Sequence, residues 1–228
     1  SIEQPLTVNG MIDTFKNDPL TFEPGADYAY NNSGYFLLGA IIEKVSGMPY
    51  AQFVEKRIFM PLGMLDTAYE GHERGKAPRA GGHTTTPAGY APSAQISMTL
   101  PYAAGSIVST VDDMARWDSA VSSGKLLKAS SWQRAFTPYM LSTGKKTEYG
   151  YGWHIGTLQG TQRIAHGGGI PGFSAHAMRL PQEKVYVVVL ANNDRMPMST
   201  EVVAARAAAI AIGKPFPELK PVAVAEEK

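Results

Sequence analysis

The strongest constraint on the fold is a change of hydrophobic pattern near residue 147. Before this point, apolar residues recur at helical spacing. After it come short runs that look like strands, separated by turns that carry Gly or Pro. The run Val185–Leu190 is typical of a strand buried on both faces. We therefore predict an α+β fold with three parts: a helical region at 1–146, an antiparallel sheet and C-terminal helix at 147–214, and a loose tail at 215–228.

The individual elements follow from the same patterns. Four strands are predicted at 149–155, 163–166, 174–180 and 184–191, and an Ala-rich helix at 200–212. The helix predicted over Gly34–Ser46 is apolar around nearly its whole circumference, so we expect it to be central and buried. Thr110 and Asp113 have the spacing of a capping box at the start of another helix. Residues 66–105 are predicted as a long loop, which in a compact domain is functional or mobile.

Composition excludes several classes of protein. The 228 residues include no cysteine, which rules out disulfides, thiolate catalysis and zinc–thiolate sites. The net charge of +1 gives no footprint for nucleic acid, and no apolar run approaches the ~20 residues of a membrane span. We predict neither a metal nor another cofactor, because four histidines lack metal-ligand spacing with carboxylates: His72, His83, His154 and His176.

Two polar stretches carry the candidate site, and the first is Tyr30-Asn31-Asn32-Ser33-Gly34-Tyr35, just before the apolar helix. Tyr30 and Asn32 are two residues apart, so in an extended or turn conformation their side chains point the same way. A phenol and an amide would then face one cavity while the helix holds their backbone. The alternative is that Asn32 or Ser33 simply caps the helix and Tyr30 packs beneath it.

The second stretch is His166-Gly167-Gly168-Gly169-Ile170-Pro171-Gly172-Phe173, between two predicted strands. Three consecutive glycines let a ligand approach the backbone closely, and His166 adds a donor or a titratable group. The alternative is a glycine-rich hairpin turn with an incidental histidine. A phosphate loop is excluded, because no Lys-Ser/Thr follows and no parallel strand–helix unit surrounds the stretch.

Taken together, Tyr-Asn-Asn-Ser-Gly-Tyr-x-Leu-Leu-Gly and His-Gly-Gly-Gly-x-Pro-Gly-Phe resemble the serine β-lactamase-like family. This family contains class C β-lactamases, D-Ala-D-Ala carboxypeptidases and related esterases, and the resemblance implies a β-lactamase/penicillin-binding-protein-like fold. It runs from about residue 18 to residue 195, and four further segments agree in the right order: Phe22–Gly25, Phe59–Met64, Ala104–Met114 and Tyr149–Trp153.

The resemblance implies roles for the site residues. Tyr30 would assist proton transfer to and from a serine nucleophile, and Asn32 would hydrogen-bond the substrate and a catalytic lysine. The stretch from His166 matches a motif that reads Lys-Thr-Gly in many members, and the backbone N–H of Gly169 would be an oxyanion-hole donor. A tyrosine with an ordinary pKa near ~10 is a poor base at neutral pH, so this role requires a neighbouring cation.

Four residues are expected to contact the substrate, two of them with an alternative. Tyr102 would line the cleft or pack in a core. Arg195 would meet a substrate carboxylate or lie on the surface. The remaining two are Gly167 and Gly168.

The family's nucleophile, the serine of a Ser-x-x-Lys motif well upstream of the Tyr-x-Asn element, is not found. Only 29 residues precede Tyr30. The textual matches Ser122–Lys125 and Ser142–Lys145 contain glycine and lie where a helix ends or a loop runs, so we interpret both as chance. We expect the chain to be the C-terminal portion of a hydrolase, inactive alone, with an unpaired sheet edge. The missing segment would be cleaved off, carried on a separate chain, or simply not included.

Two functional hypotheses follow. The first is an acyl-transfer serine hydrolase, in which water releases an acyl-enzyme formed from a small-molecule ester, β-lactam or peptide. A histidine in place of the lysine weakens a fixed positive charge, which favours esters over penicillins. The alternative is a carboxypeptidase-like relative that carries histidine at this position. The second is a non-catalytic binding module that kept the cleft and lost the nucleophile. The resemblance implies a periplasmic or secreted location.

Overall fold

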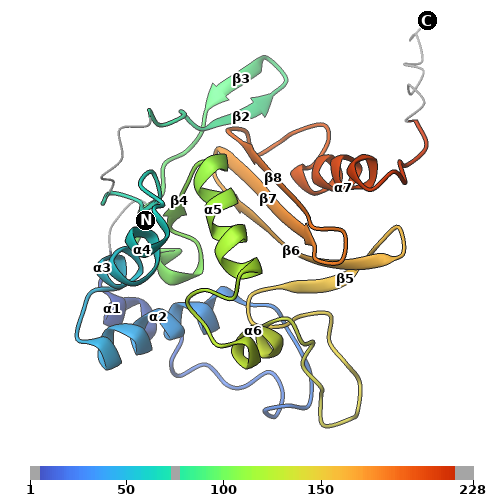
Figure 1. Cartoon of the computed structure of the whole chain (residues 1–228). Helices are drawn as coiled ribbons and strands as arrows, with labels where there is room; N and C mark the ends of the chain where they lie inside the picture. Colours follow the sequence, from blue (N-terminus) through green and yellow to red (C-terminus); the bar gives the residue numbers. More distant parts are fainter. Residues whose placement is uncertain (1–5, 73–77, 219–228) are drawn as a thin grey trace, which may run out of the picture.

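An antiparallel sheet of strand order β5-β6-β7-β8 forms the second half of the chain in this computed structural model, which describes residues 6–72 and 78–218. Helix α7 (Thr200–Ala211) packs on one face of the sheet and helix α5 (Val111–Ser122) lies against the other (Figure 1). The predicted α+β class with an antiparallel sheet and a C-terminal helix is confirmed. The strands are β5 (His154–Leu158), β6 (Thr161–Ile170), β7 (Phe173–Leu180) and β8 (Val185–Ala191).

Two short turns set the register of this sheet. Gln159 and Gly160 both have positive φ, at 49° and 85°, as a type I′ turn between β5 and β6 requires. Pro171 and Gly172 join β6 to β7, and Gly172 takes the positive φ of 84° that follows Pro in a type II turn. The glycine run therefore lies within a strand, so the alternative of a glycine-rich turn is wrong. The first strand is also later than predicted, since it begins at His154.

The core between the sheet and α7 is built from alternate residues of the central strands. Met178 and Leu180 are fully buried against Ala204 and Ala208 of α7, which let the helix approach closely. Fully burying a side chain of this size contributes about 1.5–3 kcal/mol. The strand β8, predicted to be buried on both faces, is only half-buried, and Leu190 is 42% exposed. Leu190 is exposed because it lines an open cavity. β8 is also an edge strand, which pairs with β7 alone among the described residues.

The helical part holds most of the remaining elements. Residues 66–105, predicted as a long loop, carry several short elements, and residues 219–228 of the predicted tail lie outside the described residues. In chain order the elements are α1 (Val8–Asp13), α2 (Asn32–Ser46), α3 (Tyr50–Val54), a π-helical turn (Glu55–Phe59), α4 (Met60–Leu62), β1 (Ala68–Tyr69), β2 (His83–Thr86), β3 (Gly89–Pro92), the 3₁₀ helix η2 (Tyr102–Ala104), β4 (Ile107–Val108) and α6 (Ala129–Ala135). In the described part of the chain, no helix has both the length and the apolar character that crossing a membrane requires.

Helix α2 differs from its prediction at its start and on its surface. Asn31 rather than Asn32 or Ser33 caps it, because the Asn31 side chain accepts a hydrogen bond of 2.8 Å from the Gly34 N–H. The helix is not buried all round: of its residues only Phe36 and Gly39 are buried. Its apolar residues on the opposite side are uncovered by any described element, with exposed fractions of 50%, 54% and 82% for Leu38, Ile41 and Val45.

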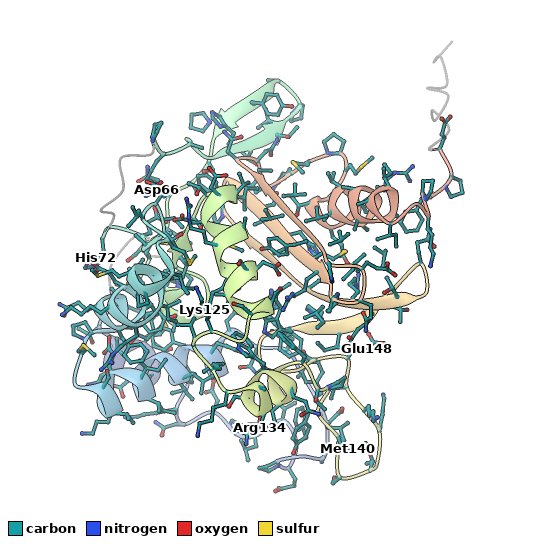
Figure 2. All side chains as sticks on the ribbon, in the orientation of Figure 1. Asp66, His72, Lys125, Arg134, Met140 and Glu148 are labelled. Atoms are coloured by element: carbon teal, nitrogen blue, oxygen red, sulfur yellow. The ribbon has the colours of Figure 1, made fainter. Side chains whose placement is uncertain are left out.

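A buried carboxylate fixes the start of α5 against the chain that follows α4. Thr110 caps the helix and accepts from the Asp113 N–H, as predicted. The Asp113 carboxylate does not return the bond as in a capping box. It is fully buried and instead accepts from the Asp66 N–H at 2.9 Å, the Thr67 hydroxyl at 2.8 Å and Arg116 at 2.8 Å. Figure 2 labels Asp66 at this end of α5.

Candidate functional site

The two polar stretches singled out in the sequence meet at one cavity of about 390 Å³. The ring of Tyr30 lies 6.0 Å from that of His166, centroid to centroid, and half of the Tyr30 side chain is exposed. Tyr30 comes from the segment before α2, and His166 from β6. We call this space the glycine-edge cavity; its lining residues are Tyr30, His154, Arg163, Ala165, His166, Gly167, Gly168, Gly169, His176 and Glu201.

The cavity lies where β6 extends beyond its neighbour β5. The pairing of these strands ends with His154 opposite Ala165, so from His166 to Ile170 this side of β6 has no strand partner among the described residues. We call this segment the glycine edge. At Gly168 and Gly169 a Cβ would have no atom within 4 Å, so a ligand has open access to the backbone there. A backbone N–H on this edge would be fixed before any reaction, as an oxyanion donor must be.

The imidazole of His166 is held by protein groups at both nitrogens. Its Nε2 lies 2.8 Å from the hydroxyl of Tyr149, and its Nδ1 lies 2.5 Å from the carbonyl oxygen of Gly167. The Tyr149 ring is buried, in edge-on contact with His154 at 4.8 Å and with Tyr30 at 5.7 Å. Burial raises the pKa of the Tyr149 phenol, and neighbouring tyrosines raise it further, so this hydroxyl keeps its proton.

The opposite wall of the cavity is polar but carries little free charge. Arg163 pairs with Glu201 at 3.1 Å. Burial lowers the pKa of His154, with further lowering by His166 and Arg163, and burial lowers the pKa of His176 against the opposing effect of Glu201. Both rings are therefore held toward the neutral form near pH 7. Within residues 6–72 and 78–218, no three His, Cys, Asp or Glu side chains are placed to hold a metal ion.

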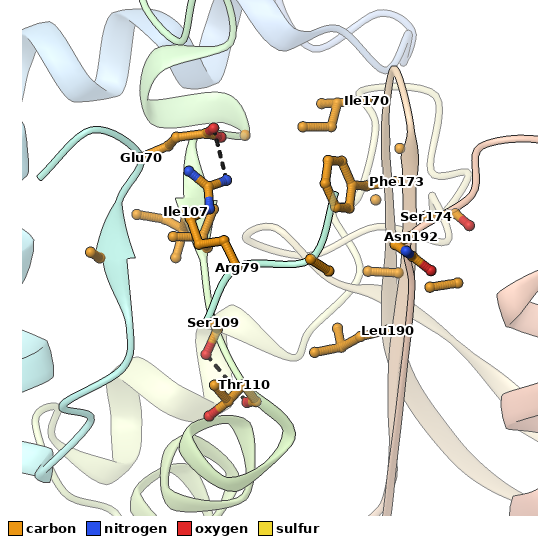
Figure 3. A pocket seen from close by; sticks show the side chains of 18 of the residues that line it. Glu70, Arg79, Ile107, Ser109, Thr110, Ile170, Phe173, Ser174, Leu190 and Asn192 are labelled. Atoms are coloured by element: carbon orange, nitrogen blue, oxygen red, sulfur yellow. Dashed lines mark hydrogen bonds and ion pairs between the residues drawn. The ribbon is translucent and has the colours of Figure 1, made fainter. Parts of the chain in front are cut away.

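A larger cavity of about 540 Å³ adjoins the glycine edge, and Gly168 and Gly169 line both. We call it the central cavity. Figure 3 shows side chains of its two walls facing one another, with the ion pair of Arg79 and Glu70 on one side and Phe173 and Leu190 on the other. It separates the β1–β4 ribbon from strands β7 and β8.

Three of the predicted site residues lie elsewhere. Asn32 is exposed at the first residue of α2, lines neither cavity, and its side chain has no hydrogen bond to another described residue. Tyr102 is 5% exposed in the helical core, with its ring 4.7 Å from that of Phe36, so the prediction that it lines the cleft is wrong. Arg195 is exposed in the loop after β8 and lines neither cavity.

Both textual matches to Ser-x-x-Lys are broken by glycine. Gly124 and Gly144 have φ of 69° and 82°, which a helical turn cannot contain, so neither match stacks a lysine on a serine. This geometry is consistent with the prediction that both matches arise by chance.

Sequence reasoning missed half of the cavity wall. Its spacing in the sequence makes His176 an ordinary histidine, yet the Pro171–Gly172 turn places it opposite Gly167 by register alone. Tyr149 falls in a predicted strand, and no local pattern pairs it with His166. Glu201 had no local signal, because its position depends on how α7 docks on the sheet. These three residues reach the site through tertiary contacts, which a local sequence pattern does not reveal.

Comparisons with known proteins identify relatives of this chain and of its fold. The family described as Beta-lactamase matches residues 3–212. Penicillin-binding protein 4* of Bacillus subtilis (strain 168) is 29% identical over 224 residues, covering 90% of this chain and 49% of that protein. A D-aminopeptidase of Gluconobacter oxydans (strain 621H) is 25% identical, covering 86% and 37%. The solved structure of an octameric penicillin-binding protein homologue from Pyrococcus abyssi superimposes with a TM-score of 0.79 at 28% identity, covering 92% and 48%. The chain thus spans about half or less of the length of these relatives.

Proposed function

Because this chain belongs to the Beta-lactamase family, a family of serine hydrolases, we propose that it supplies the substrate-binding wall and the proton-transfer tyrosine of an acyl-transfer serine hydrolase. The nucleophile would come from residues outside these 228. The resemblance predicted from the sequence is confirmed by the family match. One observation carries the proposal: Tyr30 and the glycine edge, far apart in the sequence, line the same cavity.

The proposed chemistry assigns each group one task. A serine oxygen attacks the carbonyl carbon of an ester or amide, and its proton passes by way of Tyr30 to the leaving alcohol or amine. The N–H of Gly169 stabilises the negative oxygen of the tetrahedral intermediate, a contribution worth about 10²–10³ in kcat for one such donor. Water then attacks the acyl-enzyme, which releases the acid and restores the serine.

A cation beside Tyr30 is needed for this proton transfer, and the described wall does not provide a free one. Arg163 lines the cavity but is paired with Glu201. A lysine arriving on the same helical turn as the serine would place both groups together, which supports a Ser-x-x-Lys segment as the missing part.

Uncovered surfaces around the site support the same proposal. The central cavity shares Gly168 and Gly169 with the glycine-edge cavity, so a helix lying in it would reach the glycine edge. The apolar side of α2 and the outer edge of β8 are likewise uncovered by described residues. Exposed apolar helix faces and unpaired strands of this kind are normally covered in a stable domain.

The wall favours substrates without a negative charge. His154 and His176 are held toward neutrality and Arg163 is neutralised by Glu201, so no free fixed cation from the described residues faces a substrate carboxylate in this cavity. We therefore propose small esters or amides in preference to penicillins, which carry a carboxylate.

The test compares this polypeptide with its full-length gene product, using a chromogenic ester and a serine-reactive fluorophosphonate label. We expect turnover and labelling only in the full-length protein, with the label outside the 228 residues. In that protein Tyr30→Phe should lower kcat by about 10²–10⁴, the usual contribution of general acid–base catalysis. A label on a serine of this chain would refute the proposal.

The second candidate is a non-catalytic binding module. It is favoured by the lack of a helical Ser-x-x-Lys among the described residues at the cavity. A full-length product that binds ester analogues, but is neither labelled nor active, would establish this alternative.

A further inference from the structure

The imidazole of His166 has no free nitrogen to offer a substrate, although it lies at the centre of the proposed site. Tyr149 occupies Nε2 and the Gly167 carbonyl occupies Nδ1. We propose that Tyr149 is a positioning residue that holds His166 in its Nδ1–H tautomer, so that His166 fixes the glycine edge instead of acting as a general base. The catalytic meaning of this inference rests on the proposed function, whereas the tautomer is a property of this chain alone.

The hydrogen-bond partners determine which nitrogen carries the proton. A backbone carbonyl can only accept, so the Nδ1 that faces Gly167 must be the donor. In the neutral ring, Nε2 then holds a lone pair, and within the described part of the chain the Tyr149 phenol supplies the proton that it accepts. The pair is therefore directional: Tyr149 donates to Nε2, and Nδ1 donates to Gly167.

The Tyr149 hydroxyl is well suited to this task, because its backbone is held on both sides. Its carbonyl accepts from the Tyr139 N–H at 3.1 Å and from the Thr147 hydroxyl at 3.0 Å, and its N–H donates to the same hydroxyl at 3.3 Å. Burial raises the pKa of the phenol, which keeps the donated proton in place.

Holding the Gly167 carbonyl has a consequence for the glycine edge. This carbonyl and the N–H of Gly168 belong to one planar peptide and point in opposite directions. The Gly168 N–H faces β7, where Gly168 is paired with Ala175. The contact with His166 therefore holds the other side of this peptide, which has no strand partner among the described residues. In this way Tyr149, through His166, orders the peptide that leads into Gly169.

The test reads the tautomer by long-range ¹H–¹⁵N NMR of the histidine rings in the 228-residue protein, above pH 8 where neutral rings dominate. His166→Gln identifies the signals of His166 by their loss. We expect a protonated, pyrrole-type Nδ1 and a pyridine-type Nε2 in the wild type. In Tyr149→Phe, which keeps the ring and removes the hydroxyl, the Nε2–H tautomer gains population and the two nitrogen shifts converge.

Tyr151→Phe is the matched control, because Tyr151 lies two residues further on and is 61% exposed. It should leave both nitrogen shifts of His166 unchanged. An Nε2–H tautomer in the wild type would overturn the inference without any variant. The test therefore remains decisive even if the Tyr149→Phe protein folds poorly. Wild-type shifts in a folded Tyr149→Phe protein would also overturn it. An inactive full-length protein with the expected tautomer would instead refute the proposed function alone.

Discussion

Replacing Gly39 by alanine should destabilise the protein, although alanine is the better helix former. Gly39 is buried in α2 where the helix meets η2. A Cβ at this position would lie 2.4 Å from the Cβ of Ala103 and 2.5 Å from Cε1 of Tyr102. Carbon atoms in ordinary contact are about 3.5–4.0 Å apart, so α2 and η2 would have to separate by more than about 1 Å.

The expected free-energy change follows from two opposing effects. Overpacking a well-packed core costs about 1–3 kcal/mol. Alanine in place of glycine inside a helix returns about 1 kcal/mol. Because both clashing neighbours belong to the rigid cluster around Phe36, we expect the upper end of the overpacking cost, hence a net loss of about 2 kcal/mol. For a chain of this size that lowers the melting temperature by about 4–8 °C.

Gly34→Ala is the matched control in the same helix. The nearest atom to its added Cβ is the Asn31 Oδ1 at 3.5 Å, an ordinary contact. We expect this variant to be as stable as the wild type or more stable, by up to about 1 kcal/mol. Urea unfolding followed by circular dichroism measures both. The reasoning is refuted if Gly39→Ala unfolds at the same or a higher urea concentration than Gly34→Ala.

Three further perturbations test the packing around the site. Arg179 and Asp118 form a largely buried ion pair of 2.9 Å between β7 and α5. Asp118→Leu alone leaves the arginine unpaired and should lower the free energy of unfolding by about 3 kcal/mol. The double variant Asp118→Leu with Arg179→Met should be about as stable as the wild type. Burial lowers the pKa of His176, so its contribution to stability is present above pH ~6.5 and is lost as the pH falls through the lower folded value. His176→Asn should therefore flatten the fall in melting temperature between pH 7 and pH 5. Asp113→Asn weakens the hydrogen bonds that the carboxylate accepts from Arg116 and from residues 66 and 67. It should lower the free energy of unfolding by about 2–3 kcal/mol, measured by thermal unfolding. An unchanged melting temperature would contradict this expectation.

The sheet could be predicted closely because its signals are local. A β-branched run marks β8, and turn residues mark the ends of β7 and β8. Turn chemistry explains why the glycine run is not a turn. Pro171 and Gly172 alone make the type II turn, which leaves Gly167–Gly169 in the strand. Counting residues along both strands from this turn predicts that His176 is the cross-strand partner of Gly167.

The environment of α2 and of Tyr102 could not be predicted in this way. A helix that is apolar all round predicts burial, but burial depends on what covers each side. Here η2 covers the side of Phe36 and Gly39, while Ile41 and Val45 stay exposed. Tyr102 is drawn into the helical core because Gly39 offers no side chain and the aromatic ring fills that place. Neither fact is visible before the two segments are docked.

The state of the polar groups at the site explains why the proposed hydrolase would depend on a further segment for its serine and its cation. Both nitrogens of His166 are engaged, His154 and His176 are held toward the neutral form, and Arg163 is paired. Every polar group of this wall except Tyr30 thus serves to shape or neutralise it. A wall of this kind can orient a carbonyl group against the glycine edge, but it has no base strong enough to activate a serine. Under the proposed function, serine and cation would therefore arrive together, and supplying a serine without its lysine should restore binding without restoring turnover.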